Sequence, residues 1–556
     1  MAKRKRSSDA PARSSIFTSL DPSEPAASFA ASSPYPHVQL ATIVEQPLLL
    51  KVREELQLLR STFKETDLFK VFQTGDLANV DPSNAEHAAA LPTTIELRAA
   101  LYSERFRNFV RAVTGCAPLT AQTDCSCNVY RRGGHLLCHD DVIGTRCVSY
   151  ILYLSRPGKR WRQQLGGALE LYALDAISGE VLPSPVDAIA PEFGTMVLFT
   201  VKPGVSYHSV QEVGSKAPRL SISGWFHAAN PPEGADSAAS LAQLQSAAAH
   251  VPAKAIKKPP APRRSLLPAE ERRLAAMINP AYLQPSTLKA VRAQLQQQGA
   301  ALLSAFLQPT FAEAIKEKAR ACDLKDGLSK GVIPEHAAGT QRKGWRIIGP
   351  PQLRRYMRFK APKQKKSNQQ GNGDCGAASS SSSGGGTTGN GGGQGGGSSS
   401  GSVGLLLEEV RLLMHSAAFV QLLSVLSGLT PSSCASEVRR FRPGLDYTLA
   451  HVGTQRSAGT LDATLAFVSD APSELALWDS GDVGGFECHV ESSAEDAHGA
   501  AEVYRAGEDT AGVTSIHATQ NALSLVLRRP DTMKFVKYVS AAAPGSRWDV
   551  AAEYSQ

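Results

Sequence analysis

Between Asn128 and His227 the chain reads as short apolar strands separated by turns that contain glycine or proline, with no helical pattern between them. The run from Cys147 to Ser155 is the clearest strand. Its two alternating sets are Val148, Tyr150, Leu152 and Leu154 on one face and Ile151 and Tyr153 on the other. Alternation of this kind indicates a strand whose two faces pack differently. Consecutive short strands with tight turns favour an antiparallel jelly-roll of the cupin type, and this limits the fold more than any other feature.

Three side chains near the ends of these predicted strands form a candidate metal site. His139 and Asp141 are separated by one residue. In an extended strand, both would therefore point to the same face. With His208 they supply two imidazoles and one carboxylate, the set that binds Fe(II) and leaves coordination positions open. A single His-x-Asp is common by chance, so the prediction of His139, Asp141 and His208 as metal ligands depends on the whole set.

A fourth polar residue, Arg219, opens the last predicted strand of this stretch. Ser221 and Ser223 alternate onto the same face as Arg219. A planar guanidinium binds a carboxylate through two parallel hydrogen bonds. We therefore predict that Arg219 anchors a carboxylate-bearing co-substrate beside the metal.

These motifs resemble a known family. The segments that carry the resemblance are Leu137 to Leu154, Gly167 to Tyr172, Phe193-Gly194 and Arg219 to Phe226. They are similar to the Fe(II)- and 2-oxoglutarate-dependent prolyl hydroxylases that modify a small-subunit ribosomal protein. The similarity extends from about Gln39 to the end of the sequence. It implies a mainly β chain with flanking helices, in which a catalytic double-stranded β-helix is followed by a second, metal-free copy of that fold.

The resemblance also implies an activity and its cofactors. The expected reaction is hydroxylation of a prolyl residue of a decoding-centre ribosomal protein, coupled to oxidative decarboxylation of 2-oxoglutarate to succinate and CO₂. Fe(II) would be the metal, 2-oxoglutarate and O₂ the co-substrates, and ascorbate a supporting reductant. Tyr130, Tyr153 and Ser221 would help Arg219 to bind 2-oxoglutarate, although the two tyrosines are equally typical of a barrel core. Because ribosomal proteins are basic, we expect acidic residues along the substrate path, with Asp76 and Asp140 as candidates.

The second part of the sequence echoes the first. The matching segments are Ser103, Phe106 and Gly115 with Ser416, Phe419 and Gly428; Tyr130 to Gly133 with Phe441 to Gly444; and Gly167 to Glu170 with Gly484 to Glu487. Such repetition predicts an internal duplication of one fold. In the second copy His451 has no carboxylate two residues later. We therefore predict that this copy binds no metal and has a structural or partner-binding role.

Composition divides the chain into four predicted segments. These are a disordered basic tail over 1–38, the catalytic domain over 39–228, a linker over 229–265, and the second β-helix domain over 266–556 with a Gly/Ser-rich insert at about 367–402. Segments of the insert's kind cannot bury enough apolar surface to order themselves.

Charge and cysteine content bear on compartment and partners. The 556 residues carry a net charge of +8, and the nine cysteines show no paired framework, which is typical of a reducing compartment. The run Lys3 to Arg6 suggests nuclear import, so we expect the protein in nucleus and cytoplasm. No apolar run is long enough to span a membrane. We expect neither a membrane nor DNA as partner, and the sequence leaves the oligomeric state open.

Two alternatives to a ribosomal prolyl hydroxylase remain at this stage. The duplicated barrel could serve as a non-catalytic or dual-role scaffold that binds a translation or transcription factor through the second copy. The other alternative is a prolyl hydroxylase of the collagen or oxygen-sensing type. The sequence does not distinguish addition of one hydroxyl group from addition of two.

Overall fold

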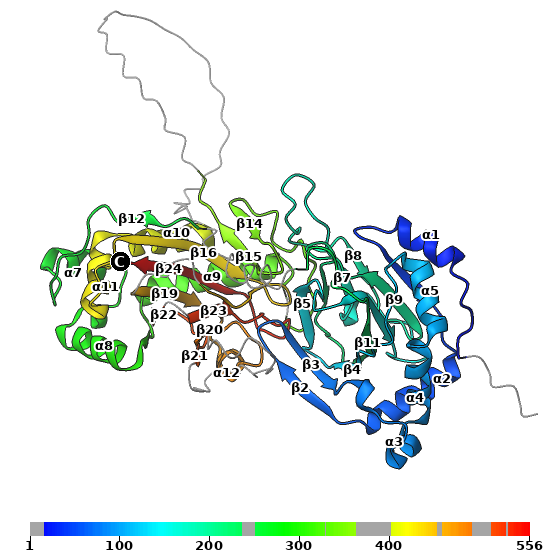
Figure 1. Cartoon of the computed structure of the whole chain (residues 1–556). Coiled ribbons are helices and arrows are strands. Elements are labelled where there is room, and N and C mark those ends of the chain that lie inside the picture. Colours follow the sequence, from blue (N-terminus) through cyan, green and yellow to red (C-terminus); the bar gives the residue numbers. More distant parts are fainter. Residues whose placement is uncertain are drawn as a thin grey trace, which may run out of the picture.

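The structure is a computed structural model that describes residues 16–235, 251–328, 330–362, 402–452, 459–491, 513–529 and 532–556. Two groups of strands lie side by side, each with its own covering helices (Figure 1). In the described residues, no single helix is long and apolar enough to cross a membrane. Helices α10 (Val403–Met414) and α11 (Ala417–Ser427) meet that criterion only as a pair bent by 62°.

The first half contains one antiparallel sheet of eleven strands. Its strands are β1 (His37–Ala41), β2 (Ser61–Glu65), β3 (Phe69–Thr74), β4 (Cys125–Tyr130), β5 (His135–His139), β6 (Arg146–Tyr153), β7 (Leu169–Leu171), β8 (Asp187–Ile189), β9 (Thr195–Thr200), β10 (His208–Val210) and β11 (Arg219–His227). They are hydrogen-bonded in the order β1-β9-β6-β11-β4-β3-β5-β10-β7-β8, with β2 on β3. The sheet curls on itself, which confirms the predicted jelly-roll fold class.

Helices cover one face of this sheet (Figure 1). They are α1 (Ser23–Ala31), α2 (Gln46–Glu55), α3 (Ala85–Ala90), α4 (Pro92–Leu101) and α5 (Glu104–Thr114). Leu49 and Phe106 of these helices join one buried cluster with Tyr150 and Leu152 of β6. Tyr153, on the opposite face of β6, belongs to a different cluster inside the curled sheet. The predicted alternation is therefore confirmed, because one face of the sheet packs on helices and the other faces the interior.

The second half has two further sheets. The larger contains β12 (Lys254–Ala255), β13 (Ala300–Leu303), β14 (Trp345–Ile348), β15 (Arg354–Phe359), β16 (Ser433–Phe441), β17 (Tyr447–Thr448), β19 (Thr460–Phe467), β22 (Ala522–Arg528) and β24 (Arg547–Ser555). The smaller contains β18 (His451–Val452), β20 (Glu487–Glu491), β21 (Val513–Ile516) and β23 (Thr532–Val536). The remaining helices are α7 (Pro268–Ala275), α8 (Pro285–Gln298), α9 (Pro309–Lys325) and α12 (Pro472–Ser480).

The two halves share one strand order. The run β13-β22-β19-β24-β16-β15 repeats β1-β9-β6-β11-β4-β3, and β18-β23-β20-β21 repeats β5-β10-β7-β8. The helix that precedes β4 in the first half and the helix that precedes β16 in the second half correspond as well. Ser103 and Ser416 cap α5 and α11 by accepting from the backbone N–H of Phe106 and Phe419, and glycines in the left-handed conformation end both helices. The repeated motifs in the sequence therefore correspond to repeated elements.

Two predicted segment boundaries need correction. Residues 16–38 were expected to be disordered, but α1 lies in this range, and Phe17 stacks on Phe106 with the ring centroids 4.6 Å apart. Two buried phenylalanines, Phe17 and Phe29, hold this Ser/Ala/Pro-rich segment to the fold. Part of the predicted linker is also ordered, because β12 pairs with β16. Residues 1–15 and 236–250 and nearly all of the Gly/Ser-rich insert lie outside the described residues.

Candidate metal and co-substrate site

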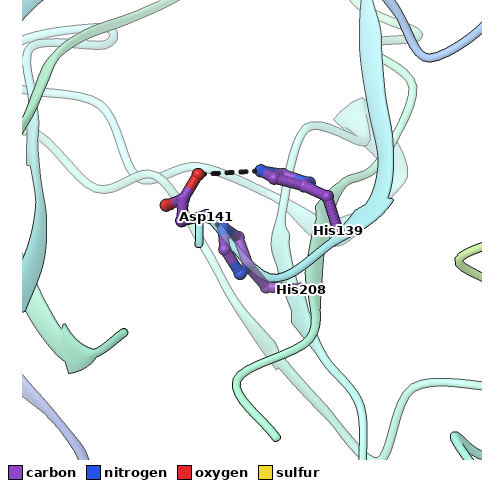
Figure 2. Close-up of side chains that lie close together, drawn as sticks. All are labelled: His139, Asp141 and His208. Carbon is purple, nitrogen blue, oxygen red and sulfur yellow. Dashed lines mark ion pairs between the residues drawn. The ribbon is translucent and has the colours of Figure 1, made fainter. Parts of the chain in front are cut away.

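The three predicted metal ligands converge (Figure 2). Strands β5 and β10 pair so that His208 lies directly opposite His139. The two oxygens of Asp141 lie 3.2 Å from His139 Nε2 and 3.4 Å from His208 Nε2. One ligand atom from each residue lies within 4.8 Å of the others, and among the described residues no other histidine, cysteine or carboxylate group forms such a cluster. This donor set fits a divalent iron ion with open positions.

Asp141 reaches the site by a different route from the one predicted. Strand β5 ends at His139, so the argument from strand alternation does not apply to Asp141. Instead, Asp141 adopts a left-handed backbone conformation with φ of 62°. Aspartate is among the residues that tolerate this region best. A turn, and not the strand, therefore brings the carboxylate to the two imidazoles.

Backbone carbonyls fix the orientation of both imidazoles. His139 Nδ1 lies 2.8 Å from the Leu137 carbonyl oxygen, and His208 Nδ1 lies 2.9 Å from that of Ser206. A carbonyl can only accept, so each Nδ1 carries the proton and donates it. Each Nε2 is then left with a lone pair that faces Asp141 and the metal position.

Two side chains that the sequence analysis did not single out hold Asp141. Ser149 Oγ donates to Asp141 Oδ2 at 2.9 Å, and Trp225 Nε1 donates to the same oxygen at 3.0 Å. Burial raises the pKa of Asp141, but when the imidazoles of His208 and His139 are protonated, their charges and hydrogen bonds outweigh burial and hold this pKa well below its ordinary value. The alternation already used for β6 and β11 would have placed Ser149 and Trp225 on the interior face.

Arg219 lies inside the curled sheet with 1% of its surface exposed. Its Nε donates to the Gly167 carbonyl at 2.9 Å and its Nη1 donates to Ser221 Oγ at 3.3 Å. The guanidinium carbon lies 5.0 Å from the ring centroid of Tyr130 and 5.1 Å from that of Tyr153. Arg219 Nη2 and the Tyr153 hydroxyl are buried without a hydrogen-bond partner.

This arrangement suits a carboxylate ligand. In the described part of the chain, no carboxylate forms an ion pair with Arg219, although a buried, unpaired guanidinium is costly. A carboxylate from a bound molecule would supply the missing charge and would accept from Nη2 and from Tyr153. The predicted residues Tyr130, Tyr153 and Ser221 therefore surround Arg219.

The second half has an arginine at the matching position, but its own carboxylates occupy that arginine. Arg547 opens β24 as Arg219 opens β11, and it donates to the Gly485 carbonyl as Arg219 donates to Gly167. Its Nε, however, lies 3.0 Å from Asp549, and its Nη2 lies 2.9 Å from Glu487. Arg547 is not among the described residues that have a buried N–H without a partner.

The position in the second half that corresponds to His208 differs as well. Lys534 lies opposite His451 in the β18–β23 pair, as His208 lies opposite His139 in the first half. The Lys534 ammonium lies 3.1 Å from Asp462 and 3.0 Å from Glu553. The second half thus has buried ion pairs where the first has its candidate metal and co-substrate positions.

We predict that Asp549→Ala destabilises the protein strongly. Asp549 is fully buried and forms ion pairs with Arg439 at 2.7 Å and with Arg547 at 3.0 Å. Removing it leaves the buried Arg547 and the half-buried Arg439 each short of a partner, which costs about 3–5 kcal/mol of unfolding free energy. Denaturant unfolding followed by circular dichroism measures this loss. The exposed residue Asp482 is the matched control, and Asp482→Ala should stay within about 0.5 kcal/mol of the parent.

The two acidic residues expected along the substrate path have local structural roles. Asp76 caps the short helix Leu77–Asn79 by accepting from the Ala78 N–H at 2.8 Å. Asp140 accepts from the N–H groups of Val142 and Gly204, both at 3.3 Å. Both side chains are half-buried. Their contact with a substrate stays a prediction.

Comparison with known proteins places this site in a family. The model of the 2OG-Fe(II) oxygenase superfamily matches residues 125–227, and that of the C-terminal oxoglutarate and iron-dependent oxygenase degradation domain matches residues 269–556. The prolyl 3,4-dihydroxylase OGFOD1 of Ostreococcus tauri is 37% identical over 534 residues, covering 94% of this chain and 95% of that protein. The prolyl 3-hydroxylase OGFOD1 of Xenopus laevis is 27% identical, covering 92% of this chain and 84% of that protein. The corresponding Mus musculus protein is 31% identical over 330 residues, covering 58% of this chain and 50% of that protein.

The curled sheet, the His-Asp-His cluster and the superfamily match define the class: an oxygenase that uses Fe(II), 2-oxoglutarate and O₂. Within that class, the chain belongs to the OGFOD1 family of prolyl hydroxylases. The protein is therefore a 2-oxoglutarate-dependent prolyl hydroxylase, as the resemblance to this family implied.

Proposed function

We propose that this enzyme hydroxylates a prolyl residue in a small-subunit ribosomal protein at the decoding centre. In this proposal His139, Asp141 and His208 hold Fe(II), and Arg219 holds the distal carboxylate of 2-oxoglutarate. The observation that carries the assignment of residues is the pairing of a converged His-Asp-His cluster with a buried arginine that has an unused N–H. The ribosomal substrate is supported by the motif resemblance described above.

Different residues of the protein have different tasks at this site: some orient the candidate metal ligands, and others shield the co-substrate anchor from water. When bound, Fe(II) with 2-oxoglutarate and O₂ supplies the oxidation that inserts one oxygen atom into a C–H bond and releases succinate and CO₂. Ser149 and Trp225 keep the Asp141 carboxylate turned toward the imidazoles. Tyr130, Tyr153 and the interior cluster around them keep bulk water away from the arginine, which strengthens its ion pair with a carboxylate.

The substrate prediction is tested by mass spectrometry. A proline-containing peptide from the decoding-centre ribosomal protein should gain about 16 Da, or a multiple of it, when incubated with the enzyme, Fe(II) and 2-oxoglutarate, because each hydroxylation adds one oxygen atom. Asp141→Gly provides the inactive control. Mass gain on a different protein in the same lysate, with none on this peptide, would refute the ribosomal substrate and leave the hydroxylase activity intact.

A further inference from the structure

The second half packs against the part of the first sheet that carries the candidate metal site (Figure 1). An apolar cluster joins the halves, with Leu68 and Leu137 from the first and Tyr447, Leu449 and Tyr538 from the second. The Tyr538 ring also lies against His135, with the ring centroids 4.3 Å apart. Strand β5, which ends at His139, is therefore supported directly by the second half.

A buried carboxylate, Glu212, crosses this interface. Its side chain accepts from three donors, all in the second half: the Tyr538 hydroxyl at 3.2 Å, Ser540 Oγ at 2.5 Å and the Ala541 N–H at 2.7 Å. Glu212 is 3% exposed, and in the described residues no cation forms an ion pair with it. Without the second half, this carboxylate would lose all three of these partners.

The backbone of Glu212 leads from this interface to Arg219. The Glu212 carbonyl accepts from the Gly167 N–H at 3.2 Å, and the Gly167 carbonyl accepts from Arg219 Nε at 2.9 Å. The approach is close, because a Cβ on Gly166 would lie 2.0 Å from the Glu212 carbonyl oxygen. A shift of Glu212 therefore moves the backbone on which the guanidinium rests.

A second buried carboxylate, Glu170 on β7, links the second half to the metal side of the site. Glu170 Oε2 accepts from Ser209 Oγ at 2.8 Å, and Ser209 follows His208 on β10. Glu170 Oε1 lies 2.7 Å from His336 Nε2, which belongs to the second half. The His336 carbonyl in turn accepts from Arg442 at 3.1 Å, so the loop that presents the imidazole is itself anchored.

We propose that the second half is a positioning element of the catalytic site. It fixes Glu212, whose backbone supports the Gly167 segment that binds Arg219, and it fixes Glu170, which binds Ser209 next to His208. Tyr538, Ser540 and His336 are its positioning residues. This inference depends on the assignment of Arg219 and His208 made under Proposed function. It gives the metal-free copy a role in catalysis that requires no ligand of its own.

The part of the proposal that links Glu212 to Arg219 is tested with the double variant Tyr538→Phe and Ser540→Ala. The ring that packs on His135 stays, and only two donors to Glu212 are lost. With Fe(II) saturating and O₂ excluded, calorimetry should show a roughly tenfold weaker affinity for 2-oxoglutarate, since two hydrogen bonds to a carboxylate are removed. The affinity for Fe(II) alone should stay near that of the parent. Tyr282→Phe, which removes an exposed tyrosine hydroxyl elsewhere in the second half, is the matched control and should change neither affinity.

The part of the proposal that links Glu170 to His208 is tested with His336→Ala. Loss of a direct outer partner of a metal ligand typically weakens metal binding by about 10–100-fold. His336 acts on His208 only through Glu170 and Ser209, so Fe(II) affinity measured by anaerobic equilibrium dialysis should fall by about tenfold, at the low end of this range. His336→Gln keeps an N–H that can donate to Glu170 and should restore part of the affinity. His415→Ala, at a histidine that contacts Ser436 within the second half, should leave Fe(II) affinity unchanged.

Parental affinities for Fe(II) and 2-oxoglutarate in both the double variant and His336→Ala, with melting temperatures that show intact folding, would overturn the proposal. An equal loss in Tyr282→Phe and His415→Ala would overturn it too, because the effect would then be general destabilisation. Arg219→Ala separates the two levels of inference. If Arg219→Ala loses 2-oxoglutarate binding and the double variant does not, the positioning of Arg219 through Glu212 fails and the site assignment stands.

Discussion

Asp141→Gly is expected to abolish Fe(II)-dependent turnover while the protein stays folded. The carboxylate is one of three side chains in the cluster, and two imidazoles alone do not complete the set that holds iron in this class. Glycine accepts the left-handed backbone conformation at this position, with φ of 62°, without strain. The substitution therefore removes the ligand and not the turn. Anaerobic equilibrium dialysis should show that Fe(II) binding is lost together with succinate formation.

The neighbouring carboxylate offers a matched control for this prediction. Asp140→Ala removes an acidic side chain one residue away that accepts from the backbone of Val142 and Gly204 and, in the described structure, has no hydrogen bond to a side chain of the cluster. Fe(II) affinity should be near parental in Asp140→Ala. Parental Fe(II) binding and turnover in Asp141→Gly would show that Asp141 is not a metal ligand.

Arg219→Ala should weaken 2-oxoglutarate binding by about 10²–10³-fold, the equivalent of about 3–4 kcal/mol, because a buried charge pair loses one partner. Fe(II) binding should stay near normal, because Arg219 contacts none of the three metal-binding candidates in the described structure. Calorimetry with saturating metal under anaerobic conditions measures the first effect, and dialysis measures the second. An unchanged affinity for 2-oxoglutarate would eliminate the anchor role.

A stability measurement also tests the predicted role of Arg219 in binding 2-oxoglutarate. Without 2-oxoglutarate, the parent buries a guanidinium whose Nη2 has no partner. Arg219→Ala, which also loses the hydrogen bonds to Gly167 and Ser221, should therefore lower the melting temperature less than the loss of a fully paired arginine does. The parent should gain stability when 2-oxoglutarate is added, and the variant should lose that gain. Arg547→Ala is the contrasting variant. It removes an arginine paired with Asp549 and Glu487 and should destabilise the protein with or without 2-oxoglutarate.

The sequence predicted which residues form the candidate site. The geometry of the site depends on contacts between residues that are far apart in the chain, so the sequence did not predict it. His139, Asp141, His208 and Arg219 were named from motif and spacing, and the structure brings the first three together. Asp141 lies beyond the end of β5, so a turn, and not the predicted strand alternation, brings its carboxylate to the imidazoles. Ser149 and Trp225 were missed because a serine and a tryptophan in a strand carry no metal-ligand signature of their own.

What the sequence alone determined about this protein follows from local rules. Alternating strands, turns with glycine or proline, and repeated motifs depend on neighbouring residues, and they predicted a jelly-roll fold, a duplication and the set of candidate ligands. Only the tertiary structure decided which buried charges are paired. Arg219 and Arg547 start equivalent strands, and Arg219 is free for a ligand because Ser221, not a carboxylate, lies beside it, whereas Asp549 and Glu487 occupy Arg547. Tertiary structure likewise decided that Glu170 and Glu212 find their partners in the second half, since contacts between residues far apart in sequence leave no periodic trace in either segment.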